Sequence, residues 1–275
     1  MTPFQIGAVE VGGPSLCVIA GPCVIEDEET CLEVGRAMRD TCAELGFGYV
    51  FKASYDKANR TSIQSFRGPG LERGTEILGR VREALGTPAL TDFHEAGQAA
   101  RIAPAVDILQ VPAFLARQTD LLVAAAETGR AVNVKKAQFM APWDMGQVVG
   151  KLREAGCDRI LLTERGVSFG YNTLVVDFRS LPQMRALGHP VCFDVTHSMQ
   201  QPSGQGSQSG ATREYAGHLA RAAVAVGIDA LFLEVHPEPA RAKSDAAAQL
   251  NIEEARTLLR QIAKLRQVMG EMPNL

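Results

Sequence analysis

The sequence predicts an α/β protein that folds as a closed (β/α)8 TIM barrel, and three observations carry this prediction. Short apolar runs rich in Val, Ile and Leu, typical of strands buried on both faces, alternate with longer amphipathic segments of helical period. Eight such strand–helix units follow one another in a chain of 275 residues. A single domain of about 250 residues is unusual outside α/β barrels and some large all-β folds. We therefore expect one barrel domain over residues 1–275.

The elements follow in order from these patterns. Segment 4–13 alternates and turns at glycines, which predicts a short β-hairpin within residues 1–14, ahead of the barrel. The apolar runs predict strands at 16–20, 49–53, 89–92, 107–111, 131–135, 159–163, 191–195 and 230–234. The amphipathic segments predict helices at 28–45, 71–85, 95–102, 119–128, 143–155, 181–186, 214–226 and 252–269. A doubly wound open sheet is the main alternative, but no Gly-x-Gly-x-x-Gly turn follows the first strand.

Composition limits the classes of function. The net charge of −3 and the dispersed basic residues argue against a nucleic-acid partner. No apolar run reaches about 18 residues, and the first residues lack the charged and apolar regions of a signal peptide, so we expect a soluble, cytoplasmic protein. The cysteines lack a paired spacing, which indicates reduced thiols rather than a disulfide framework. They are Cys17, Cys23, Cys31, Cys42, Cys157 and Cys192.

Polar residues follow every predicted strand, at the barrel end where active sites of this fold lie. Taken singly, each could be a satisfied polar group at the start of a loop. Polar groups gathered over one barrel mouth, however, require ligands or partners. They are Cys23, Lys52, Asp92, Gln110, Lys135 with Lys136, Glu164 with Arg165, His197, and Glu234 with His236.

A long basic loop follows the second predicted strand, between residues 50 and 70. Lys52 ends the strand, and Lys57, Asn59, Arg60 and Thr61 lie on the loop, so several cationic donors could converge on one anion. Arginine binds phosphate oxygens with a planar fork and lysine as a mobile point charge, so this mixture suits a phosphorylated substrate. The alternative is a solvated charged loop.

Four residues could form a metal site. Cys23, His197 and Glu234 follow strands one, seven and eight, which are neighbours in a closed barrel, and Asp245 lies on the loop beyond Glu234. Thiolate, imidazole and carboxylate ligands suit a divalent transition metal better than magnesium or calcium, without selecting among zinc, iron, manganese and cobalt. Spacing alone leaves the alternatives of a buried small residue for Cys23 and a core or substrate-contacting histidine for His197.

Several longer stretches point to one family. They are Ile19-Ala-Gly-Pro-Cys23, Phe51-Lys-Ala-Ser-Tyr-Asp-Lys-Ala-Asn-Arg60, Ser65-Phe-Arg-Gly68, Val111-Pro-Ala-Phe-Leu-Ala-Arg-Gln-Thr-Asp-Leu121, Val132-Asn-Val-Lys-Lys-Ala-Gln-Phe139, Leu162-Thr-Glu-Arg-Gly166 and Asp194-Val-Thr-His197. Over about residues 16–249 the chain resembles the 3-deoxy-D-manno-octulosonate 8-phosphate synthases, which condense phosphoenolpyruvate with D-arabinose 5-phosphate.

The resemblance implies a phosphoenolpyruvate pocket in which Lys52, Lys57, Lys135 and Arg165 hold the phosphate and carboxylate, with His197 also catalytic. The second substrate would lie nearer the mouth. Substrate-binding residues implied in this way are Asn59, Arg60, Thr61, Asp92, Gln110, Pro112, Ala113, Phe114, Arg117, Gln138 and Ser209. Arg117 resembles the residue that reaches a neighbouring subunit's site in a homotetramer.

The same resemblance implies a metal-dependent enzyme, because cysteine at position 23 marks the metal-dependent form of the family and asparagine the metal-independent form. Cys23, His197, Glu234 and Asp245 all match its ligand positions. One departure lies in the loop 200–213, where Ala211 stands in place of an expected glycine. The product of such an enzyme would serve lipopolysaccharide biosynthesis.

Three other functions remain open at this point. A related synthase takes erythrose 4-phosphate, although the string Lys57-Ala-Asn-Arg60 argues against it because that relative favours lysine-proline-arginine. A Schiff-base aldolase would use Lys135 or Lys136 as its amine. A sugar-phosphate binding protein would have no activity at all.

Overall fold

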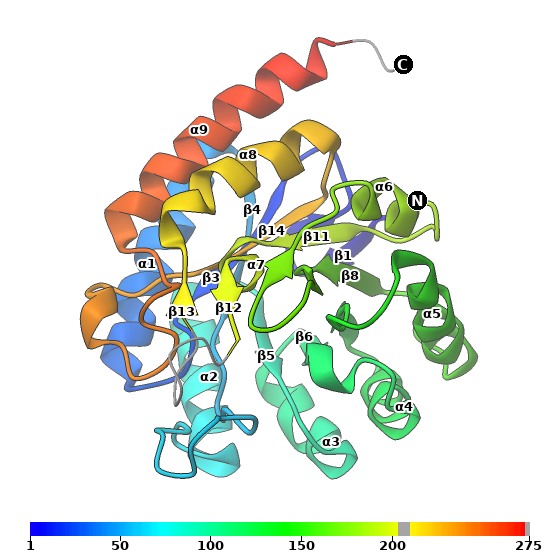
Figure 1. Cartoon of the computed structure of the whole chain (residues 1–275). Helices are drawn as coiled ribbons and strands as arrows, with labels where there is room; N and C mark the ends of the chain where they lie inside the picture. Colours follow the sequence, from blue (N-terminus) through cyan, green and yellow to red (C-terminus); the bar gives the residue numbers. More distant parts are fainter. Residues whose placement is uncertain (203–209, 273–275) are drawn as a thin grey trace.

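The barrel is closed, as predicted. The computed structural model describes residues 1–202 and 210–272. Its parallel strands follow one another around the barrel in the order β11-β14-β3-β4-β5-β6-β7-β8, and the helices surround them (Figure 1). The strands are β3 (Cys17–Gly21), β4 (Gly48–Lys52), β5 (Ala89–Asp92), β6 (Ile108–Val111), β7 (Ala131–Lys135), β8 (Ile160–Glu164), β11 (Val191–Asp194) and β14 (Ala230–Glu234). Their bounds agree with the predicted strands to within one residue at each end.

The helices also follow the predicted order. They are α1 (Glu28–Leu45), α2 (Leu71–Leu85), α3 (Ala99–Ile102), α4 (Thr119–Glu127), α5 (Met145–Glu154), α6 (Ser180–Arg185), α7 (Val195–Ser198), α8 (Ala216–Val226) and α9 (Ile252–Gly270). Three predicted helices start as 3₁₀ turns, at Ala96–Gln98, Pro142–Asp144 and Arg213–Tyr215. In the part of the chain that is described, no helix is both long and apolar enough to cross a bilayer.

Helix α7 was not predicted, and it shortens the seventh strand. The Asp194 side chain accepts a hydrogen bond from the His197 backbone N–H, so Asp194 ends the strand and caps the helix. Two short antiparallel ribbons were also missed, β9 (Val167–Ser168) with β10 (Leu174–Val175) and β12 (Gln200–Gln201) with β13 (Gly210–Ala211). Both lie in loops beyond strands of the barrel, where strand periodicity gives no signal.

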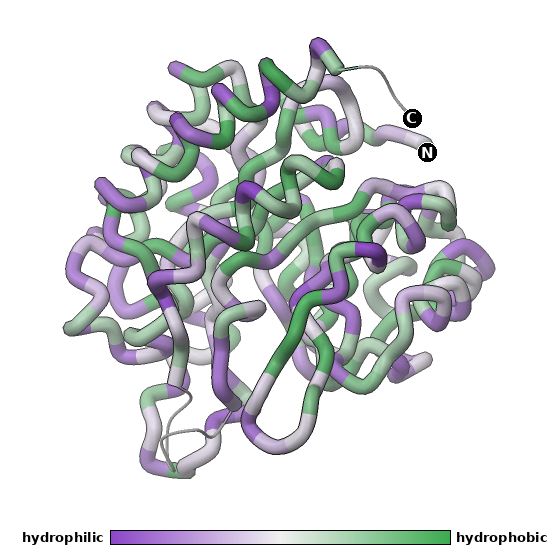
Figure 2. The backbone as a smooth tube through the Cα atoms, turned by 45° about the horizontal axis from the view of Figure 1, so that its top comes forward, coloured by the Kyte–Doolittle hydropathy of each residue, from purple (hydrophilic) through white to green (hydrophobic). Residues whose placement is uncertain are grey.

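The apolar core has two parts. One lies between the barrel and its helices, and the alternation of hydrophilic and hydrophobic residues along those helices is visible in Figure 2. The other fills the barrel, where Ile19, Leu90 and Phe232 cluster with the predicted N-terminal hairpin, β1 (Phe4–Ile6) and β2 (Val9–Val11). The hairpin therefore closes the amino-terminal end of the barrel with apolar side chains, and the carboxyl end remains for the polar residues.

Helix α2 packs closely on the start of the basic loop. A Cβ atom on Gly74 would lie 2.3 Å from the Cβ of Tyr55, whereas one on Gly79 would meet nothing within 4 Å. Tyr55 is buried, and its hydroxyl donates a hydrogen bond to Gln98 at 2.7 Å. The contact between Gly74 and Tyr55 therefore fixes where the loop leaves the barrel.

This packing predicts opposite effects of one substitution at two positions of α2. Gly74→Ala overpacks the contact with Tyr55 and should lower the free energy of unfolding by about 1–3 kcal/mol. Gly79→Ala only restrains the unfolded chain and should raise it by up to about 1 kcal/mol. Chemical denaturation of both variants measures the two changes, and equal effects would contradict the packing described here.

Candidate active site

The carboxyl end of the barrel holds a cavity of about 950 Å³. Sixteen of the residues predicted for the site line it, from all eight strand-to-helix connections except the one after β3. They are Lys52, Lys57, Asn59, Arg60, Thr61, Asp92, Gln110, Pro112, Ala113, Phe114, Lys135, Gln138, Arg165, His197, Glu234 and Asp245. The basic loop thus faces a cavity and not open solvent alone.

Three predicted residues stand apart from this lining. Cys23 lies next to it, because its Sγ atom contacts the Asp245 carboxylate at 3.1 Å. Arg117 is exposed and does not line the cavity of its own chain. Ser209 lies outside the described residues, so its predicted contact is not placed.

Glu234 is the charged centre of the cavity floor. It ends β14 with no exposed surface, and its Oε1 atom lies 2.5 Å from Lys52 Nζ and 3.7 Å from both Lys57 Nζ and His197 Nε2. Burial alone would raise the pKa of the Glu234 carboxyl, but the two lysines and His197 outweigh burial and hold this pKa below its ordinary value. Glu234 is therefore an anion at neutral pH.

Asp194 fixes two predicted catalytic side chains. Its Oδ2 atom accepts from Lys135 Nζ and lies 2.8 Å from His197 Nδ1. An ionised carboxylate only accepts, so Nδ1 carries a proton and donates to Asp194, and the ring is held with Nε2 facing Glu234. The Lys135 ammonium lies 3.4 Å from the centroid of the Phe232 ring, which adds a cation–π contact.

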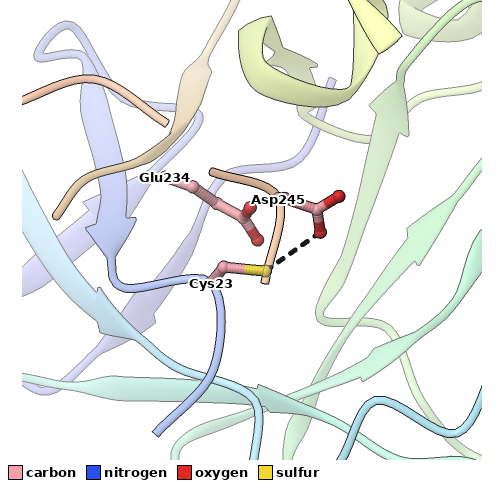
Figure 3. Close-up of side chains that lie close together, drawn as sticks. All are labelled: Cys23, Glu234 and Asp245. Atoms are coloured by element: carbon pink, nitrogen blue, oxygen red, sulfur yellow. Dashed lines mark hydrogen bonds between the residues drawn. The ribbon is translucent and has the colours of Figure 1, made fainter. Parts of the chain in front are cut away.

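Cys23, Glu234 and Asp245 form a cluster with the chemistry of a metal site (Figure 3). One ligand atom from each lies within 4.8 Å of the others. The Oε2 atom of Glu234 is buried and has no hydrogen-bond partner among the described residues, which is rare for a buried carboxylate. Burial, and next the charge of Glu234, raise the pKa of the Cys23 thiol, a bias that a bound divalent cation reverses. His197 is not part of this mutual 4.8 Å group, but its Nε2 atom lies 3.7 Å from Glu234. One thiolate and two carboxylates beside an imidazole fit a divalent transition metal.

Three further buried atoms in the cavity wall lack hydrogen-bond partners within the described ranges. They are Arg165 Nη1, Gln138 Oε1 and His94 Nδ1. Buried polar atoms are nearly always paired, so each of these atoms keeps hydrogen-bonding capacity that the described residues do not use. Arg165 in particular presents a donor suited to phosphate or carboxylate oxygens.

Sequence reasoning missed several residues that hold the predicted ones in place. Asp92 accepts from the Ser54 hydroxyl at 2.5 Å and lies 3.0 Å from His94 Nε2. Ser244 accepts from Arg60 at 2.6 Å and contacts Cys23. Gln200 contacts both Arg165 and Asp245. A weak signal existed for Ser54 and His94, which lie two residues from strand-end residues on the chain; the loop residues Ser244 and Gln200 gave none.

Some strand-end residues point away from the cavity. Lys136 is fully buried, with its Nζ atom 3.2 Å from the Met140 carbonyl and 3.5 Å from Glu164. His236 lies 3.6 Å from Glu26. These residues belong to the structure around the site and not to its lining.

Comparison with known proteins identifies the family. The model of the DAHP synthetase I family matches residues 3–271. The chain belongs to this family. Three curated relatives are named 2-dehydro-3-deoxyphosphooctonate aldolase, and the chain is an enzyme of the same family.

The relative from Cyanothece sp. (strain PCC 7425 / ATCC 29141) is 58% identical over 258 residues, 94% of each chain. That from Synechococcus sp. (strain ATCC 27144 / PCC 6301 / SAUG 1402/1) is 58% identical over 268 residues, 98% of this chain and 93% of its own. That from Geobacter sp. (strain M21) is 51% identical over 269 residues, 98% of each.

Proposed function

We propose that the enzyme condenses phosphoenolpyruvate with D-arabinose 5-phosphate and water to 3-deoxy-D-manno-octulosonate 8-phosphate and inorganic phosphate, with a divalent metal. The observation that carries the proposal is the convergence of Lys52, Lys57, Lys135 and Arg165 with a metal-ligand cluster in one cavity. The cations suit two phosphorylated, acidic reactants, and the cluster suits the cofactor.

The name of these relatives supports the choice of substrates. A 2-dehydro-3-deoxyphosphooctonate is an eight-carbon keto acid phosphate, and an aldol cleavage between C3 and C4 divides it into three and five carbons. The three-carbon part is the skeleton of pyruvate, and the five-carbon part is an aldopentose phosphate. The relative that takes the four-carbon erythrose 4-phosphate would give a seven-carbon product instead.

The reaction balances with one water molecule. A bond forms between C3 of phosphoenolpyruvate and the aldehyde carbon, whose oxygen becomes a hydroxyl. The oxygen of water bonds to C2, the bond from C2 to the phosphate oxygen breaks, and C2 becomes a ketone. Of the two protons of water, one ends on the new hydroxyl and the other leaves with phosphate.

We assign the deeper part of the cavity to phosphoenolpyruvate. Lys52 and Lys135 are buried with their ammonium groups held by Glu234 and Asp194, so they are in place before the substrate binds. Arg165 contributes Nη1, which has no hydrogen-bond partner within residues 1–202 and 210–272. Such fixed charges orient the reactants and stabilise the developing anions without reorganisation during the reaction.

We assign the mouth of the cavity to the sugar phosphate. Arg60 is partly exposed on the basic loop, where Ser244 and the Lys243 carbonyl hold its guanidinium. Asn59 and Thr61 flank it and line the same cavity. Ser209 remains a prediction for the same substrate.

Cys23, His197, Glu234 and Asp245 would hold the metal. When bound, a divalent cation polarises an aldehyde oxygen or activates water. Asp194 maintains the His197 tautomer that leaves Nε2 free as a ligand. The identity of the metal stays among zinc, iron, manganese and cobalt.

We also propose a cytoplasmic homotetramer, in which Arg117 reaches the site of a neighbouring subunit. Its exposed position outside the cavity supports this role, as do the exposed Phe114, Phe139 and Trp143 in the loops after β6 and β7. Sedimentation velocity should give about four times the mass of one 29.5 kDa chain. A monomer at micromolar concentration would contradict the proposal.

The substrates and the metal requirement are tested together by phosphate release from phosphoenolpyruvate. We expect release with arabinose 5-phosphate and not with erythrose 4-phosphate, loss after complete chelation, and recovery when metal is returned. Preference for the tetrose would replace the proposed substrate. Activity that survives chelation would leave the condensation in place and remove the metal from it.

Cys23 should be required for both metal and activity. Cys23→Ala removes one of four ligands and should weaken metal affinity by more than the roughly 10–100-fold that follows loss of an outer-shell partner. Metal content by mass spectrometry and phosphate release should fall together. The matched control is Cys31→Ala, which removes an equally buried thiol from α1 and should retain both. Full activity in a metal-free Cys23→Ala enzyme would disprove the role.

A further inference from the structure

We propose that Gln200 is a positioning residue that couples metal binding to phosphoenolpyruvate binding; this inference rests on the proposed function. Gln200 lies on the ribbon strand β12, beyond β11 and α7, and lines the cavity. Its side chain joins Arg165, assigned to phosphoenolpyruvate, to Asp245, assigned to the metal. These two residues come from connections at different places on the barrel, after β8 and after β14.

The two hydrogen bonds of Gln200 have a fixed direction. Its Oε1 atom accepts from Arg165 Nη2 at 2.9 Å, and its Nε2 atom donates to Asp245 Oδ1 at 2.9 Å. A guanidinium only donates and a carboxylate only accepts, so the reversed amide would lose both bonds. A carboxylate at this position would repel Asp245 and an ammonium would repel Arg165. The position therefore requires a neutral side chain that both donates and accepts.

Gln200 bonds to one terminal atom of each side chain, Arg165 and Asp245, and the other terminal atom remains for a ligand. Arg165 keeps Nη1 buried and unpaired within the described residues, available to an anion. Asp245 keeps Oδ2 beside Cys23 Sγ, at 3.1 Å, available to a cation. Asp245 also has a left-handed backbone, with φ at +48°, a conformation that a non-glycine residue adopts only when its surroundings hold it there.

Through Gln200, the position of Asp245 in the metal site and that of Arg165 in the phosphoenolpyruvate site depend on each other. A cation that fixes the Asp245 carboxylate also fixes Gln200, and through it the guanidinium of Arg165. Part of the ordering that phosphoenolpyruvate requires is then already complete, so metal should strengthen phosphoenolpyruvate binding. By linkage, phosphoenolpyruvate must strengthen metal binding by the same factor.

The test measures binding alone. The dissociation constant of phosphoenolpyruvate is determined by calorimetry on metal-depleted enzyme and on Co²⁺-loaded enzyme. That of Co²⁺ is determined with and without phosphoenolpyruvate, from the cobalt–thiolate absorption of Cys23. For the natural enzyme we expect the two ratios to agree at about fivefold or more.

Gln200→Leu should reduce both ratios to less than about twofold and weaken Co²⁺ binding by about tenfold. Gln200→Asn keeps the amide but is one methylene too short to span both partners, and should lose the coupling as well. The control is Gln201→Leu, which changes an exposed amide on the same strand and should keep the natural ratios. Circular dichroism verifies that each variant is folded.

The outcomes separate the two levels of the proposal. Phosphoenolpyruvate binding with equal coupling in the natural enzyme and in both Gln200 variants overturns the role of Gln200 and leaves the proposed function standing. Absence of coupling in the natural enzyme does the same. An enzyme that binds no phosphoenolpyruvate, with or without Co²⁺, overturns the proposed function and the coupling with it.

Discussion

The buried carboxylate of Glu234 is the constraint on which the site depends. An ionised carboxylate without exposed surface is strongly destabilising unless cations and hydrogen bonds surround it. Here the compensation comes from Lys52 at the end of β4, Lys57 on the next loop and His197 on α7. The order of the strands brings these residues together, because β14 pairs with both β11 and β3, and β3 pairs with β4. On the neighbouring strand β3, Gly21 lies in register with Glu234. A Cβ atom at position 21 would be 1.9 Å from the Lys52 carbonyl oxygen, so there is no room for a side chain there.

A layer of cations above an aromatic ring continues this arrangement across the barrel. Phe232 precedes Glu234 by two residues on β14, so both side chains point into the barrel. The ammonium groups of Lys135 and Lys52 lie 3.4 and 5.4 Å from the centroid of its ring. For Lys135, burial is the largest effect and lowers the pKa of the ammonium group, while the charge of Asp194 opposes that shift. The apolar core below and the charged cavity above therefore meet at one residue.

From the sequence, strand periodicity predicts the residues of this site that lie at the ends of strands. The ends of β5, β7 and β14 were predicted without error, and Asp92, Lys135 and Glu234 at these ends line the cavity. Adjacent residues such as Lys135 and Lys136 were grouped because both follow one apolar run. Alternation turns the first into the cavity and the second toward Glu164, and that distinction was available from the sequence.

What the sequence could not give is the bridging between loops. Arg60 and Ser244 are in contact across 184 positions, and Gln200 and Asp245 across 45. No periodicity specifies such contacts, because the loops are positioned by the strands they leave and by one another. Loop side chains form hydrogen bonds with polar atoms of the predicted site residues. Ser54 and His94 contact the two carboxylate oxygens of Asp92, and Gln200 bonds to one nitrogen of Arg165 and one oxygen of Asp245. Among the atoms left without partners in the described residues, Arg165 Nη1 and Glu234 Oε2 carry charges of opposite sign and belong to residues that line one cavity. An anionic substrate would satisfy the first atom and a cation the second, which is the arrangement that the coupling proposed for Gln200 requires.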